Sequence, residues 1–323
     1  MILLRERLAI TPTVTVYLAL AALLVIGSIL VGASGGVLLD QSGILNILTR
    51  STLLGLVAIG QTMVIVTGSL DLSVAYLAGL CSLVTAETMA GSTSMMAPGV
   101  LLALAVAAVV GLINGLVITV LKANAFIATL GVALILRGYL EHNYTGPAGS
   151  VPRAFQHLGY DRIGPVPVSA LLVLLIATAV WWFSRRTRTG YHLYAVGGDL
   201  DVARLSGVRT SRIIVTAHVL CASLAGLAGV LLAARLGSGA PYAGTDAGFD
   251  LESIAAAVLG GAVLAGGRGG VAGTIGGVLI LSTLDTVFDD LAVDPFLKDV
   301  VRGVVLVAAV ALYARHRLSR GPA

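Results

Sequence analysis

A small set of polar side chains interrupts long apolar stretches of this sequence. Only 11% of the 323 residues are charged, so each polar group inside such a stretch stands out. The candidates are Gln61, Asp71, Asn114, Arg137 and Glu252. An amide in this setting can exchange hydrogen bonds with a polar solute, and a carboxylate can bind a proton or pair with a cation. We therefore expect these residues to line or gate a path through the protein.

Three of these candidates also have a structural interpretation. Asp71 lies between Ser69 and Ser73 at an expected helix start, where a carboxylate can cap free N–H groups. Gln61 and Asn114 are neutral and lie deep in apolar stretches, so they could form hydrogen bonds between helices. The sequence leaves the structural and the functional interpretations open.

The charged candidates have structural alternatives as well. Arg137 could reach the interface or pair with Glu141, one helical turn further on. Glu252, with Asp250, could complement the dipole of a helix that begins there. His218 is alone in its apolar stretch, and we expect a packed polar residue rather than a metal ligand.

A compact charged segment, YAVGGDLDVARLSGVRTSR, occupies residues 194–212. Gly197 and Gly198 predict a flexible turn. Asp199 or Asp201 can then cap a short helix, because a carboxylate accepts hydrogen bonds from the free N–H groups of its first turn.

The helix that follows this turn is expected to be short. Ala203 and Leu205 favour helix, Arg204 lies between them, and Gly207 predicts the end. A short rigid helix with a small apolar face could be a solvated basic loop, or a knob that docks into a partner protein. Both interpretations fit the residues alone.

The composition places these residues in a membrane protein. The chain is 57% hydrophobic, and several stretches without Asp, Glu, Lys or Arg exceed the roughly 20 residues that span a bilayer. These stretches are Leu8–Leu39, Ser51–Leu70, Thr88–Leu121, Ile163–Ser184 and Ile213–Ala234. They are continuous blocks, whereas a transmembrane barrel would show short alternating segments. The expected fold is an all-α polytopic bundle forming a single domain over residues 1–323.

The apolar pattern predicts about ten transmembrane helices. The predicted helices cover 13–32, 51–68, 71–90, 97–121, 124–142, 166–184, 213–235, 250–266, 270–288 and 297–314. Helices with charges near their ends, those at 124–142 and from residue 250 onward, could be split or re-entrant.

The basic residues predict the orientation of the bundle. Thirteen Lys and Arg residues fall in loops on the side of the N-terminus, and five on the other side: Arg50, Arg153, Arg162, Arg235 and Lys298. Because cytoplasmic loops are enriched in Lys and Arg, this predicts cytoplasmic termini and a cytoplasmic segment at about 185–212.

Glycine and cysteine patterns add expectations about packing. Glycines spaced by four let helix backbones approach closely in lipid. Candidate pairs are Gly32–Gly36, Gly111–Gly115, Gly269–Gly273 and Gly273–Gly277. Cys81 and Cys221 lie in apolar stretches and are expected to be small buried groups.

Four stretches, in order along the chain, carry a more specific signal. They are GQTMVIVTGSLDLSVAYLAGL (60–80), GLINGLVITVLKANAFIATLGVALILRGYL (111–140), YAVGGDLDVARLSGV (194–208) and DLESIAAAVLGGAVLAGGRGGVAGTIGGVLI (250–280). Together they resemble the permeases of ABC importers of the ribose/monosaccharide type. The chain departs from the family in having Ser69 where a glycine is often found, and Asn124-Ala125 where a proline often precedes the Phe-Ile-Ala block.

The resemblance implies a function and a set of partners. It implies a type II-like permease of the plasma (inner) membrane that moves a monosaccharide or related small polar solute. A second permease copy, identical or closely related, and two cytoplasmic ATP-binding subunits would complete it, and a periplasmic or lipid-anchored sugar-binding protein would deliver the solute. ATP and Mg²⁺ would belong to the ATPase, because this chain has no G-x-x-x-x-G-K-[ST] phosphate loop and we expect no cofactor of its own.

The same resemblance assigns roles to residues. It makes Gly197, Gly198, Asp199, Ala203, Arg204, Leu205 and Gly207 the contact with the ATPase. Phe126, in the Phe-Ile-Ala block, joins the candidates for the pathway. We expect no nucleic-acid partner, and the sugar is left open.

Two other functions are weighed against the importer. An ion-coupled secondary transporter could use Asp285, Glu87 or Asp71, but it would not need the 194–212 segment. An intramembrane serine protease could use Ser34, in a Gly-x-Ser-Gly pattern, with His218 as its base.

Overall fold

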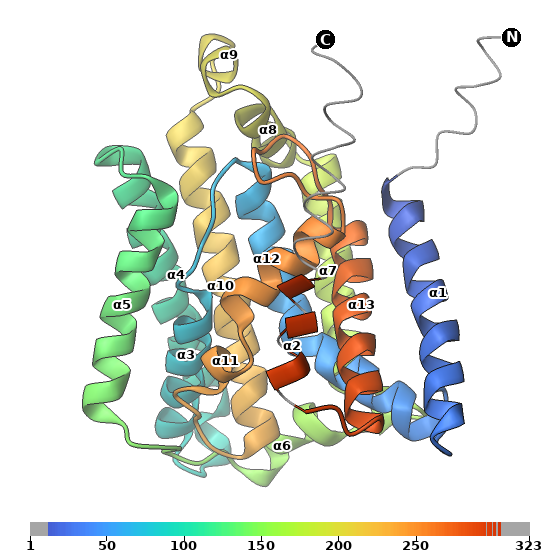
Figure 1. Ribbon diagram of the computed structural model, residues 1–323. Helices are drawn as coiled ribbons and strands as arrows, with labels where there is room; N and C mark the ends of the chain where they lie inside the picture. The colour runs from blue at the N-terminus through green and yellow to red at the C-terminus, as the bar shows by residue number, and fades with distance from the viewer. Residues whose placement is uncertain (1–11, 295, 299, 302, 305–323) are drawn as a thin grey trace, which may run out of the picture.

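The protein is a helical bundle, seen in a computed structural model that describes residues 12–294, 296–298, 300–301 and 303–304 (Figure 1). Seven of the described helices are long and apolar enough to cross a membrane. They are α1 (Pro12–Ala33), α2 (Gln41–Val66), α4 (Met96–Val120, preceded by the 3₁₀ turn η2, Thr93–Met95), α5 (Ala125–Asn143), α7 (Val168–Arg186), α10 (Thr210–Leu236) and α13 (Val271–Asp290). The expectation of an all-α membrane protein is confirmed.

Two predicted spans are shorter helices. α3 (Val74–Met89) has 16 residues. The span predicted at 71–90 began earlier, but residues 67–73 are not helical. α12 (Phe249–Leu259) has 11 residues and not the 17 predicted, because Gly261, Gly266 and Gly267 at positive φ end it and begin a loop. At about 1.5 Å per residue neither helix reaches across a ~30 Å hydrocarbon core.

Other predicted boundaries also change. α2 begins at Gln41, ten residues before the prediction, because Asp40 caps it: Asp40 Oδ1 accepts a 2.7 Å hydrogen bond from the Gly43 N–H. That bond lowers the pKa of the Asp40 carboxyl, which favours the charged form at the positive end of the helix. Most of the span predicted at 297–314 lies outside the described residues.

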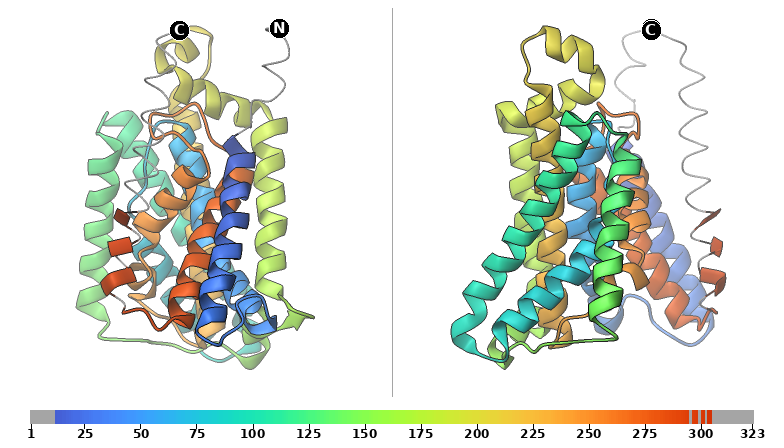
Figure 2. Two further views of the ribbon diagram at one scale, coloured as in Figure 1. Left: turned by 45° about the vertical axis from the view of Figure 1, so that its right-hand side comes forward. Right: turned by 90° about the vertical axis from the view of Figure 1, so that its left-hand side faces the viewer.

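The two ends of the bundle differ. α8 (Arg188–Gly198) and α9 (Leu200–Leu205) project from one end, together with the loop over residues 260–270 (Figures 1 and 2). The other end carries α6 (Arg153–Tyr160) and the antiparallel pair β1 (Arg162–Ile163) and β2 (Val166–Pro167). α11 (Ala243–Asp246) precedes α12. The 194–212 segment and the irregular 143–167 region therefore lie at opposite ends, as the charge pattern predicts.

α10 occupies the centre of the bundle, where it packs against α2, α3 and α4. A Cβ at Gly111 of α4 would lie 2.6 Å from the His218 carbonyl oxygen, and one at Gly115 2.7 Å from the Val215 Cα. The predicted Gly111–Gly115 pair is therefore a helix–helix contact, since only glycine leaves room for this approach.

The other glycine pairs have mixed outcomes. Gly273 and Gly277 also form a contact, because their Cα atoms face the α12 backbone at Gly260 and Ala256. Gly269 belongs to the loop before α13, and a Cβ at Gly32 would meet no atom within 4 Å, so the pairs containing these two residues are not helix contacts. Cys81 and Cys221 are buried free thiols, as predicted.

The α4–α10 contact gives a stability prediction. Gly111→Ala should lower the free energy of unfolding by about 1–3 kcal/mol, because the new methyl group would overlap the α10 backbone. The measurement is the melting temperature of the purified protein in detergent. Gly138→Ala, where a Cβ meets nothing within 4 Å, is the matched control and should not melt earlier than the wild type. Equal melting temperatures for both variants would contradict this account.

Candidate functional site

The most unusual local structure is the break between α2 and α3. α2 ends at Val66, Gly68 has a positive φ of 79°, and residues 67–73 run without helix down into the bundle before α3 begins (Figure 1). We call residues 67–73 the inter-helix segment. Ser69, Asp71 and Ser73 of this segment are buried. A break inside a membrane protein needs other groups to satisfy its main chain.

Asp71 is the centre of the hydrogen bonding in this segment. Its Oδ1 accepts from the Ser73 N–H at 3.0 Å and from the Ser73 hydroxyl at 2.5 Å. Its Oδ2 lies 3.1 Å from Asn114 Nδ2 of α4 and 3.2 Å from His218 Nδ1 of α10. Four donors from three parts of the chain therefore surround one fully buried carboxylate. Asp71 is not the helix cap considered from the sequence, because Ser73 is the N-cap residue of α3.

The main chain of the segment is bonded by side chains of other helices. The Gln61 amide of α2 is oriented so that its NH₂ donates to the Asp71 carbonyl and its oxygen accepts from the Asp71 N–H, each at 3.2 Å. The Thr129 hydroxyl of α5 accepts from the Leu72 N–H at 3.2 Å. The segment is thus tied to α2, α4, α5 and α10, and these bonds replace those that a continuous helix would make.

The structure brings together only some of the candidate pathway residues. Gln61, Asp71 and Asn114 form one buried cluster with His218. Phe126 is half exposed on α5. Arg137, on the exposed surface of α5, forms the predicted pair with Glu141 at 2.7 Å. Glu252 lies in the first turn of α12, as the dipole interpretation requires, and not in the cluster.

Four residues of the cluster were not among the sequence candidates for the path: Ser69, Ser73, Thr129 and His218. Ser69 Oγ lies 2.9 Å from His218 Nε2, and Thr129 reaches the segment from α5. Ser69 could have been found as a departure from the family pattern, and His218 as the only histidine between Arg212 and Arg235. Nothing in the sequence singles out Thr129, because a hydroxyl on a membrane helix usually bonds to its own backbone.

The order Ser69–His218–Asp71 matches that of a hydrolytic triad, but the site is not one. All three side chains are buried, so no carbonyl group of a substrate can approach the Ser69 hydroxyl. Ser34, the candidate nucleophile from the sequence, donates its hydroxyl to the Val31 carbonyl at the end of α1. The Ser34–His218 pair that the protease interpretation requires is not formed, because both ring nitrogens of His218 bond to the inter-helix segment.

The second candidate site is the pair of short helices at the end of the bundle. The flexible turn expected at Gly197 and Gly198 is wrong, because both residues belong to α8. Gly197 has a different role: a Cβ there would lie 1.8 Å from the Val66 carbonyl oxygen, which accepts from the Gly267 N–H at 2.9 Å. The end of α8 therefore rests on the end of α2, directly before the inter-helix segment.

The local structure of α9 agrees with the sequence. Asp199 is its N-cap and accepts from the N–H groups of Asp201 and Val202, each at 2.9 Å. Gly207, at a φ of 82°, follows the last turn. The cap and the stop are both confirmed.

α9 exposes apolar side chains at the projecting end of the bundle. Leu205 is 89% exposed and Val202 is 59% exposed, whereas Ala203 is buried. Arg204 pairs loosely with Asp201 at 3.6 Å, and both are exposed. Exposed apolar side chains on a projecting helix are typical of a surface that a partner protein covers. We call α9 with these two apolar side chains the knob; Val202 was missed in the sequence.

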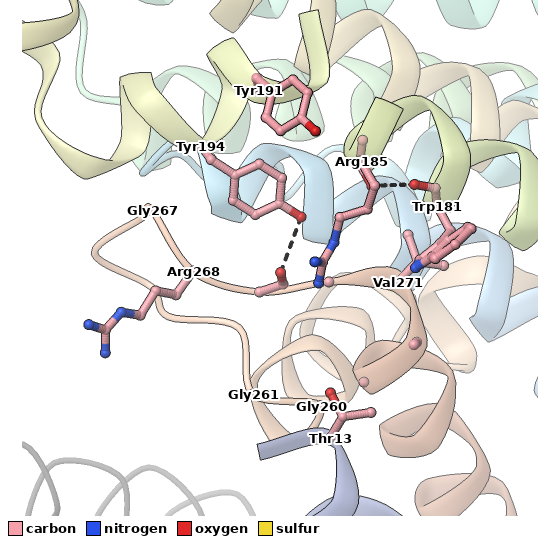
Figure 3. A pocket seen from close by; sticks show the side chains of 15 residues that line it. Thr13, Trp181, Arg185, Tyr191, Tyr194, Gly260, Gly261, Gly267, Arg268 and Val271 are labelled. Carbon is pink, nitrogen blue, oxygen red and sulfur yellow. Dashed lines mark hydrogen bonds between the residues drawn. The ribbon is translucent and has the colours of Figure 1, made fainter. Parts of the chain in front are cut away.

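A hollow of about 470 Å³ lies beside α8 (Figure 3). Trp181 and Arg185 of α7, Tyr191 and Tyr194 of α8 and the loop before α13 line it. The Tyr194 hydroxyl donates to the Gly269 carbonyl at 3.2 Å, while the Arg268 side chain points away from the hollow. α8 is therefore fixed at its end and along one side, and faces open space on another.

Comparison with known proteins adds a family and named relatives. Residues 43–310 match the model of the family described as branched-chain amino acid transport system / permease component. The chain is 38% identical to the ribose import permease protein of Bacillus subtilis (strain 168) over 279 residues, which cover 85% of each chain. It is 36% identical to the ribose import permease protein of Escherichia coli (strain K12) over 274 residues, covering 83% of this chain and 84% of that one.

A third relative has a different named solute. The galactose/methyl galactoside import permease protein of Haemophilus influenzae is 31% identical over 286 residues, covering 83% of this chain and 84% of that one. No solved structure matches the chain.

The buried cluster gives a prediction for stability. Asn114→Ala removes the donors to Asp71 Oδ2 and to Ser73 Oγ, at 3.1 and 2.9 Å, and should lower the free energy of unfolding by about 1–3 kcal/mol. Thermal unfolding in detergent measures this. Asn46→Ala, at an exposed position of α2, is the control and should melt like the wild type. An Asn114→Ala protein as stable as this control would show that the cluster does not hold the segment.

Proposed function

Since a family model matches residues 43–310, the chain belongs to the branched-chain amino acid transport system / permease component family, and we propose that it is the permease subunit of an ATP-driven monosaccharide importer. The observation that carries this is the similarity to curated relatives named for ribose, galactose and methyl galactoside, D-allose and L-arabinose. Each is at least 30% identical over more than 80% of this chain. A sugar is favoured over a branched-chain amino acid, because these relatives are all named for sugars.

The ion-coupled alternative is less well supported. The relatives are named as import permeases or as permease proteins of transport systems, which are components of larger assemblies. Asp71 accepts hydrogen bonds from four donors inside the bundle, so its carboxylate has little freedom to take up and release a proton during transport.

The knob is the contact with the ATP-binding subunit. ATP and Mg²⁺ bind to that subunit, and closure of its nucleotide sites moves α9. Gly197, Gly198, Asp199, Ala203, Arg204, Leu205 and Gly207 shape or form this contact. The motion of α9 then reaches the end of α2 through Gly197 of α8, and α10 carries it to the centre of the bundle.

The opposite end of the bundle receives the sugar-binding protein. The proposed docking loops are 143–165, 237–249 and 289–296. The first lies at this end, and the second begins there and turns into the bundle at α11. Ion pairs from Asp289 to Arg50 and Lys298 link α2, α13 and the following chain. The Tyr144 hydroxyl donates to Glu87 at 3.0 Å, and burial with this bond raises the pKa of Tyr144 to about 12, so it stays protonated at neutral pH. Tyr144 therefore remains a hydrogen-bond donor to Glu87 over the physiological pH range.

The proposed assembly is that of an ABC importer, which the family membership supports. Two permease copies form the path, each with ten apolar segments and both termini in the cytoplasm, in the plasma (inner) membrane. α3 and α12 are the two segments that enter the membrane without crossing it. Gln61, Asp71, Asn114, Phe126, Arg137 and Glu252 remain the residues proposed for the path or its gate.

Substitutions in α9 test the coupling. Asp199→Arg removes the cap of α9, and Leu205→Asp makes the exposed tip of the knob charged. Each variant should abolish at least about 90% of sugar uptake, because interface hot spots are worth about 2 kcal/mol or more. Arg204→Glu reverses a charge beside the tip and should also uncouple ATP hydrolysis from uptake. Uptake and ATP hydrolysis are measured in vesicles that contain the permease, the ATPase and the binding protein. Wild-type uptake in all three variants would contradict the coupling role.

Labelling tests the orientation. A cysteine at Ser206, next to the knob, should react with a membrane-impermeant maleimide only after the cells are opened. The control is a cysteine at Tyr160, an exposed residue of α6 at the other end, which should react in intact spheroplasts. Reaction of Ser206→Cys in intact spheroplasts would place the knob outside and rule out the importer.

A further inference from the structure

The imidazole of His218 holds the inter-helix segment at two points. Its Nδ1 lies 3.2 Å from Asp71 Oδ2 and its Nε2 lies 2.9 Å from Ser69 Oγ. His218 and Asp71 are fully buried, and Ser69 is nearly so. Because both ring nitrogens bond to the same segment, the segment cannot move along α10 without breaking at least one buried hydrogen bond.

α10 itself is held closely by its neighbours at this level. A Cβ at Gly60 of α2 would lie 2.9 Å from the Cys221 Cα, and one at Gly111 of α4 2.6 Å from the His218 carbonyl oxygen. These contacts hold the α10 backbone against α2 and α4, and the His218 side chain is attached to that backbone. The imidazole therefore moves with the helix.

The other end of α10 is next to the knob. α9 ends at Leu205 and α10 begins at Thr210, so four residues separate them. His218 lies eight residues further, about 12 Å along a continuous helix. A displacement of the knob reaches the imidazole through a single rigid element.

The start of the inter-helix segment is linked to α8 through Gly266, in the loop before α13. A Cβ at Gly266 would lie 2.6 Å from the Gly197 carbonyl oxygen and 2.9 Å from the Gly68 N. Deeper in the bundle, Leu70 packs with Ile65, Ile254 and Ala257, which extends the contact to α12. The segment is therefore surrounded by α8, α10 and the short helix α12.

We propose that His218 is a positioning residue that makes the inter-helix segment follow α10 when the ATPase moves the knob. Ser69 sets the orientation of the ring, and Asp71 transmits the displacement to the backbone of the segment. The inference rests on the proposed function, because it assigns the element through which the nucleotide-driven motion arrives.

The test uses the assembled importer in liposomes, with radiolabelled ribose, galactose, allose and arabinose as probes. The quantity measured is the number of sugar molecules imported per ATP hydrolysed. His218→Leu should lower this ratio at least about fivefold while hydrolysis continues. Ser69→Ala should lower it about twofold, and the double variant should match His218→Leu, because Ser69 acts through the ring.

Two further variants separate positioning from a general loss of stability. Thr62→Val breaks a buried 2.6 Å bond between Thr62 and Thr274 that does not involve α10, and it should keep the wild-type ratio. His218→Gln retains an N–H for Asp71 and should recover most of the ratio lost in His218→Leu.

Each failure has a distinct meaning. A wild-type ratio in His218→Leu, or equal losses in His218→Leu and Thr62→Val, would overturn the positioning role. If His218→Leu does not fold, Ser69→Ala decides, and a wild-type ratio in that variant overturns the inference. Wild-type importer that hydrolyses ATP but imports none of the four sugars would count against the proposed function instead.

Discussion

A backbone that leaves the helical conformation inside a membrane must find hydrogen bonds within the protein, because lipid offers none. The inter-helix segment is where this protein meets that constraint. Gln61 and Thr129 bond to its main chain, and Asn114 and His218 bond to Asp71. These four side chains come from α2, α5, α4 and α10. Their hydrogen bonds to the inter-helix segment therefore determine which faces of these four helices point inward.

The arrangement of α10 follows from the same constraint. Bonds of about 3 Å between short side chains require helices that pack closely, and glycines on α2 and α4 allow that approach. α10 is therefore both the central packing element and the donor of His218. Because it starts four residues after the knob, the element that satisfies the break is also the one nearest to the proposed motor contact.

The two candidate sites are joined by backbone contacts as well as by α10. Val66, the last residue of α2, accepts from Gly267 and touches Gly197 of α8, and the inter-helix segment begins at the next residue. Tyr194 links α8 to the same loop at Gly269, beside an open hollow. α8 and α9 thus combine an exposed knob with one fixed end and one partly open side. This arrangement suits helices that a partner protein moves. The exposed Leu205 is the apolar surface that we propose this partner covers.

The sequence by itself determined the class, most of the membrane-spanning helices and which loops share an end of the bundle, because uninterrupted apolar stretches and the positions of Lys and Arg reflect a bilayer. It also determined the cap and the stop of α9, since Asp199 and Gly207 act within a few residues of themselves. The tertiary structure alone decided where α3 and α12 begin and end, and that Gly197 is a contact instead of a turn. It also brought Ser69, Asp71, Asn114 and His218 together from positions up to 149 residues apart. Apolar periodicity cannot reveal these features, because an unwound segment stays buried only when distant helices supply its hydrogen bonds.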